Sequence, residues 1–169
     1  ALKKSDFKKK NLKKLVNLKK LKFPIISKPI NEGSSLGVKL SYNKIHLYNS
    51  LRKLFKDYNE LIIEEYVGGQ EIQVAVMNGR SLGAIELIPR RLFYDYKAKY
   101  TKQAKTLHVM PARIPKTKYK EVLKIAQRAH KFLRCKGVTR SDFKFYKNKF
   151  YLLEINTQPG MTKLSLVPE

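Results

Sequence analysis

The octapeptide EINTQPGM, residues 154–161, places a carboxylate and a carboxamide two positions apart at the end of an apolar run. In a β-strand, residues i and i+2 project from the same face, so Glu154 and Asn156 would present their side-chain oxygens side by side. Such oxygen ligands suit a hard cation such as Mg²⁺. A solvated strand end before the turn at Pro159 and Gly160 would contain the same residues, so the octapeptide alone leaves both interpretations open.

A second carboxylate comes from the preceding segment. VTRSDFKFY and FYLLEINT are predicted to form a hairpin with a three-residue loop, 147–149. In that register Asp142 lies directly opposite Glu154, and both share a face with Asn156. Two carboxylates and an amide repel each other unless cations lie between them, which favours a Mg²⁺ site. A two-residue turn would put Asp142 and Glu154 on opposite faces, so the prediction depends on the loop length.

Two basic side chains could meet anions near this site. Arg140 shares a face with Asp142, and a guanidinium beside bound metal suits an anionic transition state. The alternative is a simple ion pair with Asp142 or Glu154. Lys28 lies within the apolar stretch IISKPI. A lysine in a buried strand is costly without an anion, which a phosphate would supply, unless the side chain reaches a sheet edge.

Two further segments carry weaker signals for a nucleotide. EGSSLG, residues 32–37, offers backbone N–H groups that can cradle phosphate oxygens, but it has neither the P-loop spacing nor a GxGxxG pattern. LIIEEYVGGQE, residues 61–71, runs a strand into a turn that leaves backbone groups for a base edge, with Glu71 near the ribose. Taken without its context, this second segment is better explained by an ordinary hairpin with an exposed Glu71.

The elements that must position these residues follow from hydrophobic periodicity. Residues 1–22 form a basic helical stretch, and residues 44–58 and 117–134 also repeat with helical period. The apolar face of the last helix is predicted to comprise Val122, Ile125, Ala126, Ala129, Phe132 and Leu133. Strands are predicted at 25–29, 38–40, 61–67, 71–77 and 81–88, with a hairpin turn at Asn78-Gly79. This order predicts an α+β fold with antiparallel sheets and flanking helices.

Composition sets the broad class. The chain has 169 residues, 43% of them hydrophobic, which is enough for a folded core. With 37 Lys and Arg against 13 Asp and Glu, the net charge is +24. Such a charge attracts polyanions, although a coding bias towards Lys, Asn, Ile and Tyr would produce it as well.

The location of the protein is predicted from three features. Cys135 is the single cysteine, which excludes an internal disulfide and suits a reducing compartment. No apolar run approaches the roughly 18 residues of a spanning helix. The first residues are charged and resemble no signal peptide. These features predict a cytoplasmic protein, or a piece of one.

Five stretches together resemble the ATP-grasp ligases and, within them, the D-alanine–D-alanine ligase family. They are FPIISKPINEGSSLGV, LIIEEYVGGQEIQVAV, FYDYKAKY, TRSDF and YLLEINTQPGMTKLSLVP. They occur in the family's order and cover nearly the whole chain from Phe23 on. Any one motif could arise by chance, but five in order are highly specific.

The resemblance implies an ATP-grasp fold with a central subdomain at 23–88 and a C-terminal subdomain at 89–169, whose mobile loop is 89–106. It implies that Asp142, Glu154 and Asn156 hold two Mg²⁺ ions, with Mn²⁺ as an alternative. The implied ATP site comprises Lys28, Glu64, Glu65, Tyr66, Val67, Glu71, Tyr94, Lys99 and Leu153. The implied catalytic groups are Arg140, the Gly160 N–H, Ser34 and Tyr100, and Ser165 and Leu166 receive the second D-alanine.

The implied activity is ATP-dependent joining of two D-alanines through an acyl phosphate, for peptidoglycan precursor synthesis. The implied partners are D-alanine, ATP and a second copy of the complete protein, with no nucleic acid or membrane. Lys97 stands where the family usually has an acidic residue, which bears on loop closure. The family's N-terminal domain and final helix have no counterpart here, so we expect a fragment that cannot make dipeptide alone.

Three alternatives remain open from the sequence. The chain could belong to another ATP-grasp carboxylate–amine ligase or a D-alanine–D-lactate ligase. A basic nucleic-acid-binding module would explain the charge of +24 but not Glu154 and Asn156. An inactive remnant that still folds would explain the motifs without any activity.

Overall fold

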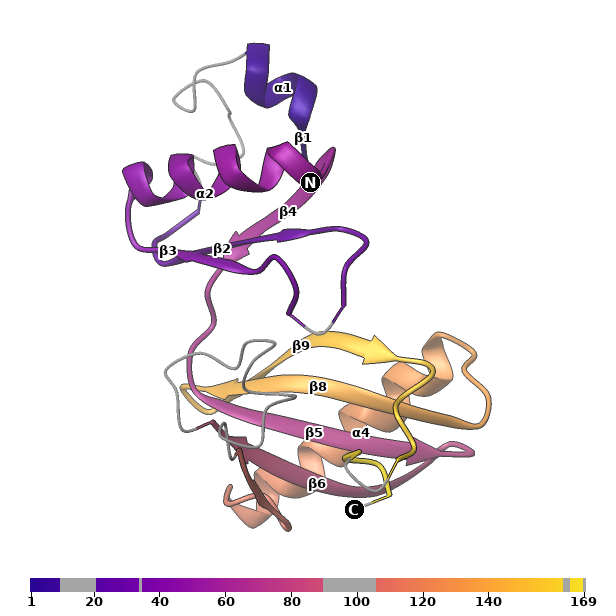
Figure 1. Ribbon diagram of the computed structural model, residues 1–169. Helices are drawn as coiled ribbons and strands as arrows, with labels where there is room; N and C mark the ends of the chain where they lie inside the picture. Colours follow the sequence, from indigo (N-terminus) through magenta and orange to yellow (C-terminus); the bar gives the residue numbers. More distant parts are fainter. Residues whose placement is uncertain (10–20, 34, 90–105, 163–164, 169) are drawn as a thin grey trace. The chain divides into compact units, whose positions relative to one another are not determined.

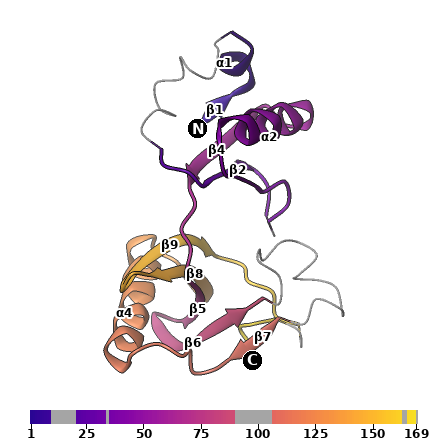
Figure 2. The same ribbon diagram turned by 90° about the vertical axis from the view of Figure 1, so that its left-hand side faces the viewer.

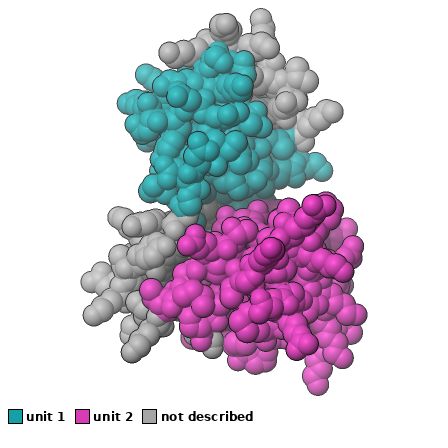
Figure 3. All heavy atoms as spheres, turned by 90° about the vertical axis from the view of Figure 1, so that its right-hand side faces the viewer, with its two compact units in different colours: residues 1–66, 91–104 teal, residues 67–90, 105–169 magenta. Residues whose placement is uncertain are grey.

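The computed structural model of the chain describes residues 1–9, 21–33, 35–89, 106–162 and 165–168. These residues divide into two packed units, the first ending at Tyr66 and the second beginning at Val67 (Figure 3). The subdomain limits of 23–88 and 89–169 inferred from the family stay a prediction. Among the helices in these ranges, none is both long and apolar enough to cross a membrane.

The first unit is a four-stranded antiparallel sheet with helix α2 packed on it (Figure 1). Its elements are β1 (Leu2–Lys3), α1 (Lys4–Lys9), β2 (Ile25–Pro29), β3 (Lys39–Ser41), α2 (Lys44–Asp57) and β4 (Glu60–Glu65), in the sheet order β1-β4-β2-β3. The side chain of Asn43 caps α2 by accepting a hydrogen bond from the His46 N–H. The apolar face of α2 then buries Leu47 and Leu51 against the sheet residues Ile25 and Leu61.

The second unit is a five-stranded antiparallel sheet with helix α4 on one face (Figure 2). Its elements are β5 (Gln70–Met77), β6 (Arg80–Ile88), β7 (Leu107–Val109), α4 (Lys116–Phe132), β8 (Val138–Tyr146) and β9 (Lys149–Asn156), in the sheet order β7-β6-β5-β8-β9. Ile72, Val74 and Val76 alternate along β5 and form a core with Val122 and Ala126 of α4. Residues between them project from the opposite side of the sheet, which we call the far face.

The predicted α+β fold with antiparallel sheets and flanking helices is confirmed. Asn78 and Gly79 form the predicted hairpin turn, and both have positive φ angles, 49° and 78°. The strand β7 was not predicted, because it has only three residues. Phe132 and Leu133 were predicted to be buried but are 85% and 55% exposed, because the buried stripe of α4 runs through Val122, Ala126 and His130 and these two side chains lie outside it.

Of the predicted basic helical stretch 1–22, the structure describes one helix, α1, and residues 10–20 lie outside the described part of the chain. Leu2 and Lys3 form a short strand instead, paired with β4.

Candidate active site

The hairpin between β8 and β9 decides where the predicted metal ligands lie. The predicted three-residue loop is wrong: Tyr146 pairs with Lys149, and the turn contains only Lys147 and Asn148. Both turn residues have left-handed φ angles, 47° and 63°, which matches the tight turns whose twist suits a hairpin. With an unbroken ladder, this turn would place Asp142 opposite Leu153.

A β-bulge in the same hairpin restores the predicted pairing. The register shifts between Phe143, which pairs with Leu152, and Asp142, which pairs with Glu154, so Leu153 is the extra residue. Arg140 is likewise directly opposite Asn156. Directly opposed residues share a face of the sheet. The two carboxylates, the amide and the guanidinium therefore gather on the far face, as predicted, by a different route.

Asp142 is buried and already has partners. Arg140 donates from Nε to Oδ1 at 2.8 Å and from Nη2 to Oδ2 at 3.0 Å, a bidentate pair. Gln73, on the neighbouring strand β5, donates from Nε2 to Oδ2 at 3.1 Å. The structure therefore contains the ion pair that the sequence offered as the alternative for Arg140.

The donor set on the far face fits a hard cation. Asp142 is opposite Glu154, and the side-chain oxygen of Asn156 projects from the same face two residues further on. The Asn156 oxygen also accepts a hydrogen bond from the Gln158 N–H at 3.1 Å, which fixes the amide at the strand exit. Within the described ranges no cluster of three or more His, Cys, Asp or Glu side chains surrounds a metal position, so the set here is two carboxylates and one amide.

The sequence offered Glu71 either as a ribose ligand or as an exposed hairpin residue, and the structure excludes the exposed hairpin residue. Its carboxylate is mostly buried and forms a 3.1 Å ion pair with Lys144 on β8. The two residues are directly opposed across β5 and β8, on the same face as Gln73 and Asp142. The far face thus carries two cross-strand pairs between β5 and β8, namely Glu71 with Lys144 and Gln73 with Asp142.

The turn after β9 brings together two predicted site residues. Ser165 Oγ accepts a hydrogen bond from the Thr162 N–H at 3.0 Å and lies 2.9 Å from Thr162 Oγ1. A Cβ atom on Gly160 would lie 2.8 Å from Ser165 Oγ, so only glycine fits at 160 without a shift. Leu166, the next predicted substrate residue, lines a small cavity of about 30 Å³ with Gln73 and Arg140.

In the first unit, Lys28 forms an ion pair with a carboxylate of the same chain. Lys28 Nζ lies 2.7 Å from Glu64 Oε1, and both side chains are partly exposed. The burial cost that suggested a phosphate is thereby offset by Glu64 in this state. The adjacent Glu65 accepts a hydrogen bond from the Lys22 N–H at 2.8 Å, and the Tyr66 N–H donates to the Pro24 carbonyl.

The Gly/Ser loop begins with a residue tied to α2. Burial raises the pKa of Tyr58, and the adjacent Glu32 carboxylate raises that pKa further by its charge and by a hydrogen bond. The Glu32 carboxylate, at the start of the loop, therefore lies beside Tyr58, the residue that follows α2.

The remaining predicted site residues lie at the start of the second unit, on β9 or outside the described ranges. Val67 opens the second unit, and Leu153 is the exposed bulge residue of β9. Four predicted site residues lie outside the described residues, namely Ser34, Tyr94, Lys99 and Tyr100. So do residues 90–105 of the predicted mobile loop 89–106.

Two residues of the far face escaped the sequence reasoning. Gln73 and Lys144 both project beside predicted site residues, as the registers of β5 and β8 require. The alternation of EIQVAVM already placed Gln73 on the face opposite Ile72 and Val74. Their partners lie 69 and 73 positions away along the chain. Only the pairing of β5 with β8 therefore reveals what these two side chains contact.

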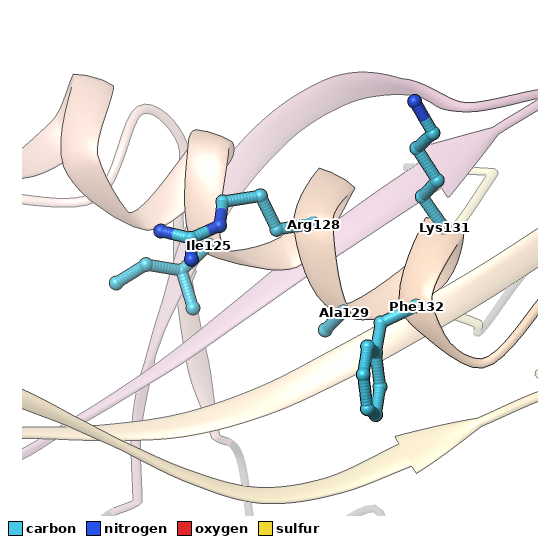
Figure 4. Close-up of a pocket in the computed structure, with 5 residues that line it drawn as sticks. All are labelled: Ile125, Arg128, Ala129, Lys131 and Phe132. Atoms are coloured by element: carbon cyan, nitrogen blue, oxygen red, sulfur yellow. The ribbon is translucent and has the colours of Figure 1, made fainter.

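A larger groove of about 560 Å³ lies along α4, on the other side of the sheet (Figure 4). Its lining residues are Ile125, Arg128, Ala129, Lys131 and Phe132. They include neither a carboxylate nor an amide, and none was predicted to bind a ligand. The groove is therefore not part of the candidate site.

The matching family model and the related proteins of known name point to the same family. The family model described as D-ala D-ala ligase C-terminus matches residues 1–169. The chain is 60% identical over 159 residues to the D-alanine–D-alanine ligase of Pelagibacter ubique, covering 94% of this chain and 51% of that protein. It is 44% identical over 147 residues to the enzyme of the same name from Citrifermentans bemidjiense, covering 86% and 48%.

Two solved structures of ligases resemble the chain over nearly its whole length. The D-alanine–D-alanine ligase from Bacillus anthracis complexed with ATP is 33% identical, with a TM-score of 0.77, over 99% of this chain and 52% of that one. The VanG D-Ala:D-Ser ligase from Enterococcus faecalis is 28% identical, with a TM-score of 0.81, over 99% and 49%. The chain spans about half the length of the relatives that it matches.

The sequence motifs, the ATP-grasp fold of the solved neighbours and the whole-length match to the family model lead to one assignment. This chain belongs to the D-alanine–D-alanine ligase family, of which it corresponds to the C-terminal part.

Proposed function

We propose that this chain supplies the nucleotide, metal and acceptor sites of an ATP-dependent D-alanine–D-alanine ligase. In the complete reaction the γ-phosphoryl group of ATP passes to the carboxylate of one D-alanine. The amine of a second D-alanine attacks the resulting acyl phosphate, and the tetrahedral intermediate releases phosphate to leave the dipeptide. The product serves peptidoglycan precursor synthesis.

The observation that carries the proposal is the cross-strand pairing of Asp142 with Glu154 beside Arg140 and Asn156. Such a concentration of oxygen ligands on two neighbouring strands, β8 and β9, has no role in the core, which lies on the other face of the sheet. It does have a role if two anions, a nucleotide phosphate and a carboxylate, must be brought together. The relative from Bacillus anthracis whose structure holds ATP supports the choice of nucleotide.

Each group then has a defined task. Asp142, Glu154 and Asn156 would hold two Mg²⁺ ions, or Mn²⁺ in their place, which neutralise phosphate charge when bound. Arg140, fixed by Asp142, would stabilise the oxyanion of the tetrahedral intermediate together with the Gly160 N–H. The Ser165 hydroxyl and the Leu166 N–H would orient the carboxylate of the accepting D-alanine.

Several segments of the chain are assigned to the nucleotide. Lys28 and Lys99 are assigned to the phosphates, Glu64 to Val67 and Leu153 to the adenine, and Glu71 to the ribose. Tyr94, Ser34 and Tyr100 are assigned to loop closure, which excludes water from the acyl phosphate. Binding of phosphate by Lys28 requires that its ion pair with Glu64 at 2.7 Å opens or is shared.

The test compares thermal unfolding of the chain with ATP and Mg²⁺ against ATP and EDTA. We expect a rise in Tm that requires both ATP and Mg²⁺, because a ligand that binds only the folded state stabilises it. Glu154→Gln should abolish most of the rise. Glu121→Gln, which changes an exposed carboxylate on α4 that pairs only with Lys118 among the described residues, should keep it. An equal rise in EDTA, or none at all, would contradict the proposed metal-dependent site.

The setting of the complete protein is also proposed. We infer a homodimer that acts in the cytoplasm on D-alanine and ATP, without nucleic acid or membrane as a partner. The solved D-Ala:D-Ser ligase shows that this fold also serves another acceptor in a relative. Competition between D-alanine and D-serine as acceptors in the dipeptide assay would identify the acceptor.

A further inference from the structure

Gln73 occupies an unusual place for a glutamine. It lies in the middle of β5, the central strand of the sheet, and is only 2% exposed. Its neighbours Ile72 and Val74 belong to the apolar core on the other face. Gln73 itself is directly opposite Asp142, and its Nε2 donates to Asp142 Oδ2 at 3.1 Å. A buried amide therefore touches a predicted metal ligand.

The orientation of this amide is dictated by its partner. An ionised carboxylate only accepts hydrogen bonds, so the NH₂ group of Gln73 must face Asp142 and the carbonyl must face away. Among the described residues, Gln73 Oε1 has no hydrogen-bond donor within reach. A buried acceptor without a partner is unfavourable, because it has lost its hydrogen bonds to water. An apolar residue would fill the strand position without that cost, so packing alone does not explain the glutamine.

The hydrogen bond does explain it. Asp142 Oδ2 accepts from both Gln73 Nε2 and Arg140 Nη2, which occupies both lone pairs of that oxygen. Two donors from two neighbouring strands fix the plane of the carboxylate relative to Glu154. Gln73 does this without adding a charge, whereas a lysine would compete with the metal and a glutamate would repel Asp142.

We propose that Gln73 is a positioning residue of the metal site, which holds the Asp142 carboxylate in the orientation that binds Mg²⁺. The inference rests on the proposed function, because it presumes that Asp142 is a metal ligand. Partners of metal ligands commonly contribute about 10- to 100-fold to metal affinity. Gln73 would be such a partner on β5, a strand that itself carries no predicted metal ligand.

The experiment is a calorimetric titration of the 169-residue chain with ATP at stepped concentrations of free Mg²⁺. The variant Gln73→Met removes the amide and keeps the length of the side chain. Gln73→Val, a β-branched residue suited to a strand, serves if the first variant folds poorly. Gln127→Met is the matched control, because Gln127 Nε2 donates a similar 3.1 Å hydrogen bond to Ser81, away from the far face.

We expect Gln73→Met to raise the half-saturating Mg²⁺ concentration about 10- to 100-fold, with the affinity for ATP in EDTA unchanged. Gln127→Met should leave the Mg²⁺ requirement as in the unaltered chain, even if it lowers Tm. If the unaltered chain requires Mg²⁺ and Gln73→Met requires no more of it, the positioning role is wrong and the proposed function stands. If the unaltered chain shows no Mg²⁺-dependent binding of ATP, both are wrong.

Discussion

Charged side chains on the far face of the second unit are held by partners on neighbouring strands. The pair of Glu71 and Lys144 is the clearest case, since both side chains are mostly buried at a separation of 3.1 Å. We predict that Lys144→Met lowers the free energy of unfolding by about 1–3 kcal/mol, because it leaves a buried carboxylate without its cation. Urea denaturation of the single variants and of Glu71→Gln/Lys144→Met would give the coupling energy.

The matched control is the pair of Lys118 and Glu121 on α4, which is 2.8 Å long and much more exposed at Glu121. Its double-mutant cycle should give less than about 1 kcal/mol. A coupling energy for Glu71 and Lys144 no larger than that of the control would show that their burial adds nothing.

Individual ligands could be predicted from the sequence only as far as strand alternation reaches. Glu154 and Asn156 share a face because they are two residues apart, and this required no structure. The pairing of Asp142 with Glu154 was predicted from a loop one residue too long, and a bulge one residue in size compensates for the error. No glycine or proline at or beside Leu153 marks such a bulge in the sequence. The partners of Lys28 and Lys144 depend on registers between strands, which periodicity does not reveal.

At the scale of the elements, Glu86 joins three segments. Its carboxylate on β6 accepts hydrogen bonds from Gln70 Nε2 at 2.9 Å and from the backbone N–H and Nε of Arg113, each at 3.2 Å. Burial alone would raise the pKa of Glu86, but the hydrogen bonds from Gln70 and Arg113 outweigh it and lower the pKa below its ordinary value. The strand, the start of β5 and the segment before α4 therefore depend on an ionised Glu86.

The sign of the pH dependence follows. A folded-state pKa below the unfolded value contributes stability that is complete above the unfolded pKa and is lost as the pH falls through the folded one. We predict that Glu86→Gln lowers stability by about 1–3 kcal/mol at neutral pH and reduces the loss of stability below about pH 4.5. Urea midpoints across acidic pH would measure this. Identical pH profiles for Glu86→Gln and the control Glu121→Gln would contradict it.

Helices and strands were largely predictable because each shows its own period. The predicted helix 44–58 corresponds to α2, which ends one residue earlier, and the predicted alternation of EIQVAVM is found in β5. The prediction for Phe132 was wrong because the buried side chain in the last turn of α4 is His130, which bonds to Thr139 on β8, and the apolar period alone does not reveal this. The three residues of β7 are too few to show any period.

At the scale of the whole molecule, the net charge of +24 is the dominant feature. Like charges repel in the folded chain, and salt screens them as the Debye length falls from about 30 Å at 0.01 M to about 8 Å at 0.15 M. We predict that Tm rises over this range of NaCl in the absence of ligand. Equal ionic strength supplied as KCl should act alike, because screening does not depend on the cation. A Tm that falls with salt would show that attractive ion pairs outweigh the repulsion.

The bulge at Leu153 has a consequence for self-association. β9 ends the five-stranded sheet, and it carries the exposed apolar side chains of Tyr151, Leu152 and Leu153. A regular strand of this kind would offer free backbone groups to a strand of another molecule, and an irregular one pairs poorly. Deleting Leu153 would keep Asp142 opposite Glu154 through the two-residue turn but would straighten the edge. The bulge residue, which the pairing of Asp142 with Glu154 would not need in a shorter strand, thus helps to keep neighbouring molecules from adding to the sheet.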